Sequence, residues 1–380
     1  MSEPLRPAGA RQPTAGPPAR TVPDACPGAW RRHDATDGAL ARFRPVGGAV
    51  AAAELRALSR AAAAGGSPLE LTSRGSLQVR GLTADAADAL AEELATLATG
   101  SASLLDAQGR DLPCSVVASP RSSRLDGAAA ALADALRGRT DVPGRLLVAL
   151  DDGSGDVAGL GADVTVALAG ERASLTLAGT PTDVTADDPA GLALAAVEAF
   201  LAVRGSAWRV AEVGAERVLF ALRARACSSV PQHGRARTRP DAREVLPRLG
   251  EVGTDAAQVL ADLGDAGAAL RVTPWRTVVL RGLADPDDAM QRLDGLVETG
   301  PSPWSTLSAC VGAPRCARSH TDVRGDLTRA VAAGRAGGLL PAHWVGCARA
   351  CGTPAGPVAV VEGTPSGTYR TIVRAGKVSP

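Results

Sequence analysis

The sequence has no apolar run long enough to span a bilayer and no apolar segment of the kind that begins a secretory leader. It also has almost no net charge, +1 from 41 basic and 40 acidic residues, which argues against a nucleic-acid or membrane-surface partner. Lysine is nearly missing, since Lys377 is the only one, so an arginine by itself identifies no anion site. A hydrophobic content of 45% in 380 residues predicts a soluble globular protein with two or more cores, which we expect in the cytoplasm.

Four of the seven cysteines fall in two pairs, a pattern unlike a disulfide framework. Five residues separate Cys310 from Cys316, and three separate Cys347 from Cys351. Structural zinc sites mostly use gaps of about two to four residues in both pairs. The observed gaps suit four thiolates around a [4Fe-4S] cluster, which is our leading prediction. Zinc, or four buried thiols without a metal, are the alternatives.

The cysteine pairs also carry a family resemblance. The five-residue gap followed by Gly-Cys347-x-x-x-Cys351-Gly resembles the cluster signature of the sirohaem-dependent nitrite and sulfite reductases and of their relative, precorrin-3B synthase. The resemblance covers residues 28–380 and implies one [4Fe-4S] cluster on Cys310, Cys316, Cys347 and Cys351. In the reductases one of these cysteines also bridges the cluster to sirohaem, whereas the synthase uses the tetrapyrrole site for its substrate.

An internal repeat organises the chain. The pattern from residue 38 to residue 98 predicts strand, helix, strand, strand, helix, which is half of a ferredoxin-like unit. Its hairpin, Leu71–Leu82, aligns without gaps on Val272–Leu283, and a shorter alignment joins Val116–Arg121 to Cys310–Arg315. We therefore predict an α+β fold: a tandem duplication of a ferredoxin-like half-domain and a nitrite/sulfite-reductase-type α/β catalytic domain, with a ligand cleft between the copies.

The repeat also predicts the domain boundaries and a single cluster. The first copy has Val116, Ser122, Ala149 and Gly153 where the second has its cysteines, so only the second copy can bind a cluster. The expected segments are a disordered tail (1–26), half-domain 1 (27–99), catalytic-type domain 1 (100–225), a linker (226–242), half-domain 2 (243–300) and the cluster-binding catalytic-type domain 2 (301–380).

The resemblance further implies a site for a polycarboxylate tetrapyrrole. In the reductases a Thr-x-Arg-x-x-x-Gln run on the first hairpin contacts the macrocycle, and here it is Thr72, Arg74 and Gln78. Arg44 resembles a reductase arginine that lies over the macrocycle, and Arg145 stands at one of two reductase lysine positions. These five residues are the predicted substrate-binding set, because arginine pairs well with carboxylates.

Two departures from the reductase pattern favour the synthase. Cys114 replaces a reductase arginine, and Leu147 replaces the second lysine. Holding and protonating a small anion such as sulfite or nitrite depends on electrostatic stabilisation, which the loss of two cations weakens. The resemblance therefore implies a precorrin-3B synthase-like monooxygenase, which hydroxylates precorrin-3A at C20 with dioxygen and forms a lactone in aerobic cobalamin biosynthesis.

The cofactors and partners follow from that hypothesis. The [4Fe-4S] cluster would receive electrons from a donor that the sequence does not identify. A mononuclear non-haem iron is a second candidate cofactor, with His320 and His343 as the histidines nearest the cysteines, although no two-His-one-carboxylate set is evident. No catalytic side chain can be named.

Two other functions remain open at this stage. A sirohaem-dependent nitrite or sulfite reductase is favoured by the shared cluster motif, and sirohaem would then be a cofactor. A non-catalytic iron-sulfur or zinc module, acting in electron transfer or as a scaffold, belongs to another class of function. The visible spectrum and the metal content of the protein separate these alternatives.

Overall fold

The computed structural model describes residues 24, 26–224, 242–336, 338, 340–354 and 356–374. The predicted disordered tail and linker therefore lie outside the described residues, apart from Asp24, Cys26 and Ala242. Asp24 and Cys26 pack against the first catalytic-type domain, since Asp24 accepts the backbone N–H of Arg145. None of the described helices is long and apolar enough to cross a membrane.

The first half-domain has the predicted order of strands and helices. Its elements are β1 (His33–Ala35), β2 (Gly38–Phe43), η1 (Val46–Gly48), β3 (Ala49–Val50), α1 (Ala52–Ala64), β4 (Leu69–Leu71), β5 (Leu77–Leu82) and α2 (Ala84–Thr96). Helix α1 begins where the carboxylate of Glu54 accepts the N–H of Ala51 at 2.9 Å. It buries Leu55 and Leu58 at helical spacing and packs on β5.

The second half-domain repeats this order. Its elements are β11 (Arg243–Val245), η3 (Arg248–Gly250), β12 (Glu251–Val252), α7 (Thr254–Asp265), β13 (Ala269–Val272), β14 (Val278–Arg281) and α8 (Pro286–Leu293). Helices α1 and α7 pack against each other, and Leu58, Leu77, Leu260 and Leu280 belong to one hydrophobic core. The two half-domains thus share a single core.

The half-domains also exchange short strands. β3 of the first copy pairs antiparallel with β13 of the second, and β12 of the second pairs antiparallel with β4 of the first. The sheets consequently run β1-β2-β5-β4-β12 and β11-β14-β13-β3. Because each copy completes the sheet of the other in the same way, the two copies are related by a pseudo-twofold axis, in agreement with the predicted duplication.

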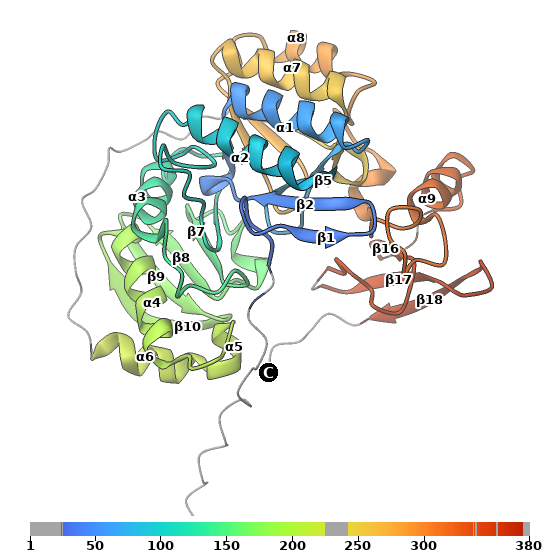
Figure 1. Cartoon of the computed structure of the whole chain (residues 1–380). Coiled ribbons are helices and arrows are strands. Elements are labelled where there is room, and N and C mark those ends of the chain that lie inside the picture. The colour runs from blue at the N-terminus through green and yellow to red at the C-terminus, as the bar shows by residue number, and fades with distance from the viewer. Residues whose placement is uncertain are drawn as a thin grey trace, which may run out of the picture.

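The two catalytic-type domains lie on opposite sides of the half-domains (Figure 1). The first comprises β6 (Ser115–Ala118), α3 (Asp126–Leu136), β7 (Leu147–Asp151), η2 (Ala158–Leu160), β8 (Val164–Ala169), β9 (Arg172–Leu177), β10 (Thr180–Ala186), α4 (Pro189–Val203), α5 (Val210–Val213) and α6 (Ala215–Arg223). The second comprises η4 (Pro303–Thr306), β15 (Leu307–Ala309), α9 (Val323–Ala332), β16 (Ala342–Val345), β17 (Val358–Gly363) and β18 (Tyr369–Arg374).

Both catalytic-type sheets have the same topology. In the first, β6, β7 and β8 are parallel and β9 is antiparallel; in the second, β15, β16 and β17 are parallel and β18 is antiparallel. The first sheet continues into β10 and packs on α4, around a core that includes Leu150, Val166 and Phe200. The fold is therefore the predicted α+β duplication, with the loops after β15 and β16 positioned beside the first half-domain.

The exchanged strands generate a stability prediction at Gly48. This residue has φ +83°, and a Cβ there would lie 2.5 Å from the carbonyl oxygen of Val272 in the other copy. Gly48→Ala should lower the free energy of unfolding by about 3 kcal/mol, the sum of left-handed backbone strain and overpacking. Gly66→Ala is the matched control, because Gly66 has φ +66° but no heavy atom within 4 Å. If urea denaturation gave the same loss in the free energy of unfolding for both variants, the close contact between Gly48 and Val272 would be contradicted.

Candidate functional site

The four predicted cluster cysteines lie on loops that follow two adjacent parallel strands. Cys310 comes directly after β15, Cys316 lies between β15 and α9, and both Cys347 and Cys351 follow β16. Because the carboxyl ends of parallel strands meet at the same edge of a sheet, these loops converge. All four cysteines line one cavity of about 320 Å³.

Cys310 is held by the backbone of the neighbouring strand. Its N–H donates to the carbonyl oxygen of Trp344 at 2.9 Å, and its Sγ accepts the N–H of Gly346 at 3.3 Å. Burial raises the pKa of the Cys310 thiol, and the Gly346 N–H opposes this by favouring the thiolate. Backbone hydrogen bonds to sulfur are among the interactions by which proteins tune iron-sulfur clusters.

The thiols are more widely spaced in this structure than the sulfurs around a bound zinc ion. Tetrahedral zinc with Zn–S bonds of about 2.3 Å places its sulfurs about 3.8 Å apart. Within the described residues, the only group of three or more metal-ligating side chains with all ligand atoms within 4.8 Å of one another consists of aspartates. No three of the thiols lie that close together. Four thiols that line one cavity are the donor set that a [4Fe-4S] cluster uses.

His343 positions the loop of the second cysteine pair. Its ring is fully buried between the hydroxyl of Ser308, at 2.8 Å from Nδ1, and the carbonyl oxygen of Cys351, at 2.9 Å from Nε2. Because a carbonyl only accepts, Nε2 must carry the proton and Nδ1 must accept from Ser308. Burial lowers the pKa of His343 to about 4, so the ring is neutral. Both nitrogens are engaged, and the residue does not fit the predicted role of an iron ligand.

The opposite wall of the cavity comes from the first half-domain. Thr72 and Gln78, both predicted to contact a macrocycle, line it together with Arg42. Arg42 donates to the Oε1 atom of Gln78 at 2.8 Å, while its Nε is buried without a partner. Burial and the nearby Arg44 lower the pKa of Arg42 to about 10. Arg42 therefore remains a cation at neutral pH, with an unused hydrogen-bond donor.

The predicted substrate residue Arg44 does not line the cavity with the cysteines. Its side chain is 4% exposed and donates to the carbonyl oxygens of Leu112, at 3.1 Å, and Pro27, at 2.8 Å. It belongs instead to a second cavity of about 670 Å³, which Trp30 and Trp208 also line. The structure thus separates Arg44 from Thr72 and Gln78.

Arg145 and Arg74 are likewise absent from the lining of the cysteine cavity. The guanidinium of Arg145 lies 4.7 Å from the ring centroid of Trp208, and its Nε is 3.8 Å from a carboxylate oxygen of Asp24. Arg74 donates to the carbonyl oxygen of Arg145 at 2.7 Å. Of the five predicted substrate residues, the structure places two beside the cysteines and three away from them.

A network of four charges joins the half-domains to the loop of the first cysteine pair. Glu70 and Glu251 face each other across the β4–β12 pair, and both interact with Arg315 and Arg324. The Arg324 side chain also donates to the carbonyl oxygen of Cys310 at 3.2 Å. The network therefore fixes the loop of the first cysteine pair against the other copy.

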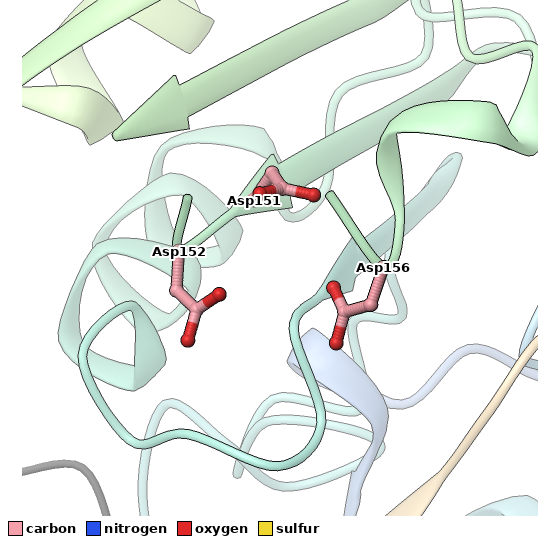
Figure 2. A group of neighbouring side chains, drawn as sticks. All are labelled: Asp151, Asp152 and Asp156. Atoms are coloured by element: carbon pink, nitrogen blue, oxygen red, sulfur yellow. The ribbon is translucent and has the colours of Figure 1, made fainter. Parts of the chain in front are cut away.

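The first copy has an acidic loop at the place of the cysteines. The N–H of Asp152 donates to the hydroxyl of Ser119 at 3.0 Å, as the N–H of Gly346 does to Cys310. The sequence alignment placed Val116 at the position of Cys310. The strand register corrects this: Ser119 is the residue equivalent to Cys310, because Val116 lies inside β6. Figure 2 shows the carboxylates of this loop, from Asp151, Asp152 and Asp156.

The two departures from the reductase pattern lie in the interior of the first catalytic-type domain. Cys114 is fully buried, and Leu147 is 5% exposed in β7. Burial raises the pKa of the Cys114 thiol to about 12, so it is neutral. Neither side chain supplies a cation to a bound anion.

Sequence reasoning predicted none of the six arginines that line the cysteine cavity; three of them, Arg42, Arg276 and Arg324, matter most for its charge. Arg42 lies two residues before the predicted Arg44, but Arg44 stands outside β2 and lines the other cavity, so the prediction of Arg44 did not point to Arg42. In the alignment of the two hairpins Arg276 stands opposite Gly75. Replacement of a turn glycine by arginine indicates that the second turn has a role that the first one lacks. Arg324 gave no signal among the 40 arginines.

Comparisons with known proteins agree with this fold. Residues 33–97 match the family model described as the nitrite/sulfite reductase ferredoxin-like half domain. No curated protein matches the chain. The solved structure of the Mycobacterium tuberculosis NirA protein is similar with a TM-score of 0.64 and 19% sequence identity, over 89% of this chain and 74% of that one. The chain therefore contains a half-domain of the nitrite/sulfite reductase type and shares its overall fold with NirA.

The cysteine set can be tested by metal analysis. Changing Cys310, Cys316, Cys347 or Cys351 to Ala should remove iron and acid-labile sulfide from the purified protein, because each supplies one thiolate. Cys26→Ala is the matched control and should keep both, since Cys26 lies away from this cavity. Full iron and sulfide in the Cys347→Ala protein would refute the ligand set.

The charge network gives a second prediction. Arg324→Gln leaves Glu70 and Glu251 facing each other with one cation fewer and should cost about 2 to 4 kcal/mol of folding stability. It should also speed the loss of iron, because Cys310 loses a hydrogen bond. Arg329→Gln on the same helix is the control: its side chain is 67% exposed, and we expect a change within about 0.5 kcal/mol. Equal melting temperatures and equal rates of iron loss would argue against the network.

Proposed function

We propose that the protein is an oxidoreductase with a [4Fe-4S] cluster on Cys310, Cys316, Cys347 and Cys351 beside a binding cavity for a polycarboxylate tetrapyrrole. The observation that carries this proposal is the single cavity that all four cysteines share with Thr72 and Gln78 of the other copy. A site at the interface of two domains is a common location for a large ligand.

The lining of the cavity suits an anionic ligand. It contains six arginines and one glutamate, namely Arg42, Arg80, Arg276, Arg318, Arg324, Arg349 and Glu70. Glu70 and Arg80 are already engaged in ion pairs, Arg80 with Asp37 at 2.9 Å. The excess of positive charge would hold carboxylates around a macrocycle, and arginine pairs with them in a fixed geometry.

The residues of this chain would bind and orient, while the cofactor supplies the redox chemistry. When bound, a [4Fe-4S] cluster transfers electrons one at a time. His343 and Arg324 would keep the two cysteine loops in place through the carbonyl oxygens of Cys351 and Cys310. The mononuclear non-haem iron lacks support: within the described ranges, the one close group of metal-ligating side chains is the aspartate cluster.

The first candidate reaction is sirohaem-dependent reduction of nitrite or sulfite. It is supported by the match of residues 33–97 to the half-domain model that carries the name of these reductases. In that case sirohaem would occupy the tetrapyrrole cavity.

The second candidate is precorrin-3B synthase, with precorrin-3A as the substrate, dioxygen as the oxidant and a separate electron donor. The observation that favours it is that buried, uncharged side chains, Cys114 and Leu147, occupy two positions where the reductases have cations. Arg145 is also already neutralised by Asp24. Such a site is poorly equipped to hold and protonate a small anion.

One purification under exclusion of oxygen separates these functions. A reductase should carry sirohaem, absorb strongly in the Soret region and convert sulfite or nitrite with a viologen donor. A synthase should show only the broad absorption of the cluster and should convert precorrin-3A to a hydroxylated lactone, detected by mass, once dioxygen and a reductant are added. Zinc without iron or sulfide would overturn the proposal in both forms and leave a scaffold function.

A further inference from the structure

Arg276 is a half-buried cation without a hydrogen-bonding or ion-pair partner among the described residues. It lies in the turn between β13 and β14 and lines the cavity that the cysteines share. Its side chain makes no hydrogen bond or ion pair with any residue that the structure describes. Burial and the neighbouring Arg324 lower the pKa of Arg276.

The backbone of Arg276 is also in an unfavourable conformation. Its φ is +63°, in the left-handed region that glycine adopts without strain and arginine does not. The equivalent residue of the first copy is Gly75, with φ +65°. The same turn is therefore made by glycine in one copy and by a strained arginine in the other. A strained residue that also buries an unpaired charge costs stability twice, and such costs concentrate at ligand sites.

We propose that Arg276 binds a carboxylate of the ligand in this cavity. This inference rests on the proposed function and adds a residue from the second copy, opposite Thr72 and Gln78 of the first. A Cβ on Gly352 would lie 3.9 Å from the Nη2 atom of Arg276, so the guanidinium reaches the loop that carries Cys351. A carboxylate there would meet a cation that has all its side-chain donors available, and would need to displace no existing acid.

The carboxylate is favoured over smaller anions by geometry and by size. A guanidinium offers two parallel N–H groups that match the two oxygens of a carboxylate. The carboxylates of a tetrapyrrole lie on its rim. One arginine on each copy would therefore hold the macrocycle across the interface between the copies. Arg42, with its unused Nε donor, is the corresponding cation on the first copy.

The test uses the cluster-loaded protein and uroporphyrin III, a tetrapyrrole with eight carboxylates, followed by its Soret band. Arg276→Gly should weaken binding about 10- to 100-fold, the loss expected for one charge-assisted contact. The melting temperature should stay unchanged or rise, because glycine removes the backbone strain. Arg276→Asn also tolerates positive φ and should behave like the glycine variant, whereas Arg276→Lys should keep part of the affinity. Arg292→Gln on α8 is the control for lost charge.

The outcomes separate the inference from the proposed function. If the unchanged protein is purified without a tetrapyrrole and does not bind uroporphyrin III, the tetrapyrrole function fails, and the role of Arg276 fails with it. If it binds and Arg276→Gly binds equally well, only the role of Arg276 is overturned. A shift in the reduction potential of the cluster at constant porphyrin affinity would likewise overturn it and assign the cation to the cluster. A porphyrin with four N-methylpyridinium groups should not lose affinity in the glycine variant.

Discussion

The pairing of β4 with β12 is the interaction on which the site depends. It places Glu70 of the first copy opposite Glu251 of the second, and like charges in direct opposition destabilise a sheet. Arg315 and Arg324 compensate both carboxylates, and both arginines belong to the domain that carries the cysteines. The same contact that joins the two copies therefore also places the loop of Cys310 and Cys316 against the first half-domain.

The two copies share the same backbone topology but differ in the side chains at equivalent positions. Glu70 has Arg271 as its equivalent in the second copy, and Arg271 pairs with Asp126 at 2.7 Å. The charge at this strand position is thus reversed between the copies, whereas the equivalent of Glu251 is the uncharged Ala49. At the ends of the parallel strands, Ser119 stands where the other copy has Cys310. One scaffold consequently supports a thiol site on one side and an acidic loop closed by its own hydrogen bonds on the other.

Burial and partners, more than residue type, distinguish the arginines of this protein. Arg44, Arg74 and Arg145 match the reductase pattern in sequence, yet each is already engaged with carbonyl oxygens or with an acid. Arg42 and Arg276 had no such match, and both line the cavity without an ion pair among the described residues. A cation that is already neutralised has little to offer a ligand, because an incoming carboxylate must first displace its partner.

The sequence by itself determined the order of elements and the α+β duplication, and it singled out the four cysteines that line one cavity. These features depend on local periodicity and on spacing along the chain. It predicted Thr72 and Gln78 beside the cysteines through the resemblance of one hairpin. The tertiary structure alone decided which arginines stay unpaired, that Cys310 corresponds to Ser119, and that His343 holds the Cys351 loop. These features depend on contacts between residues distant in sequence, where strand register and the nearest counter-charge are set by packing and not by any local pattern.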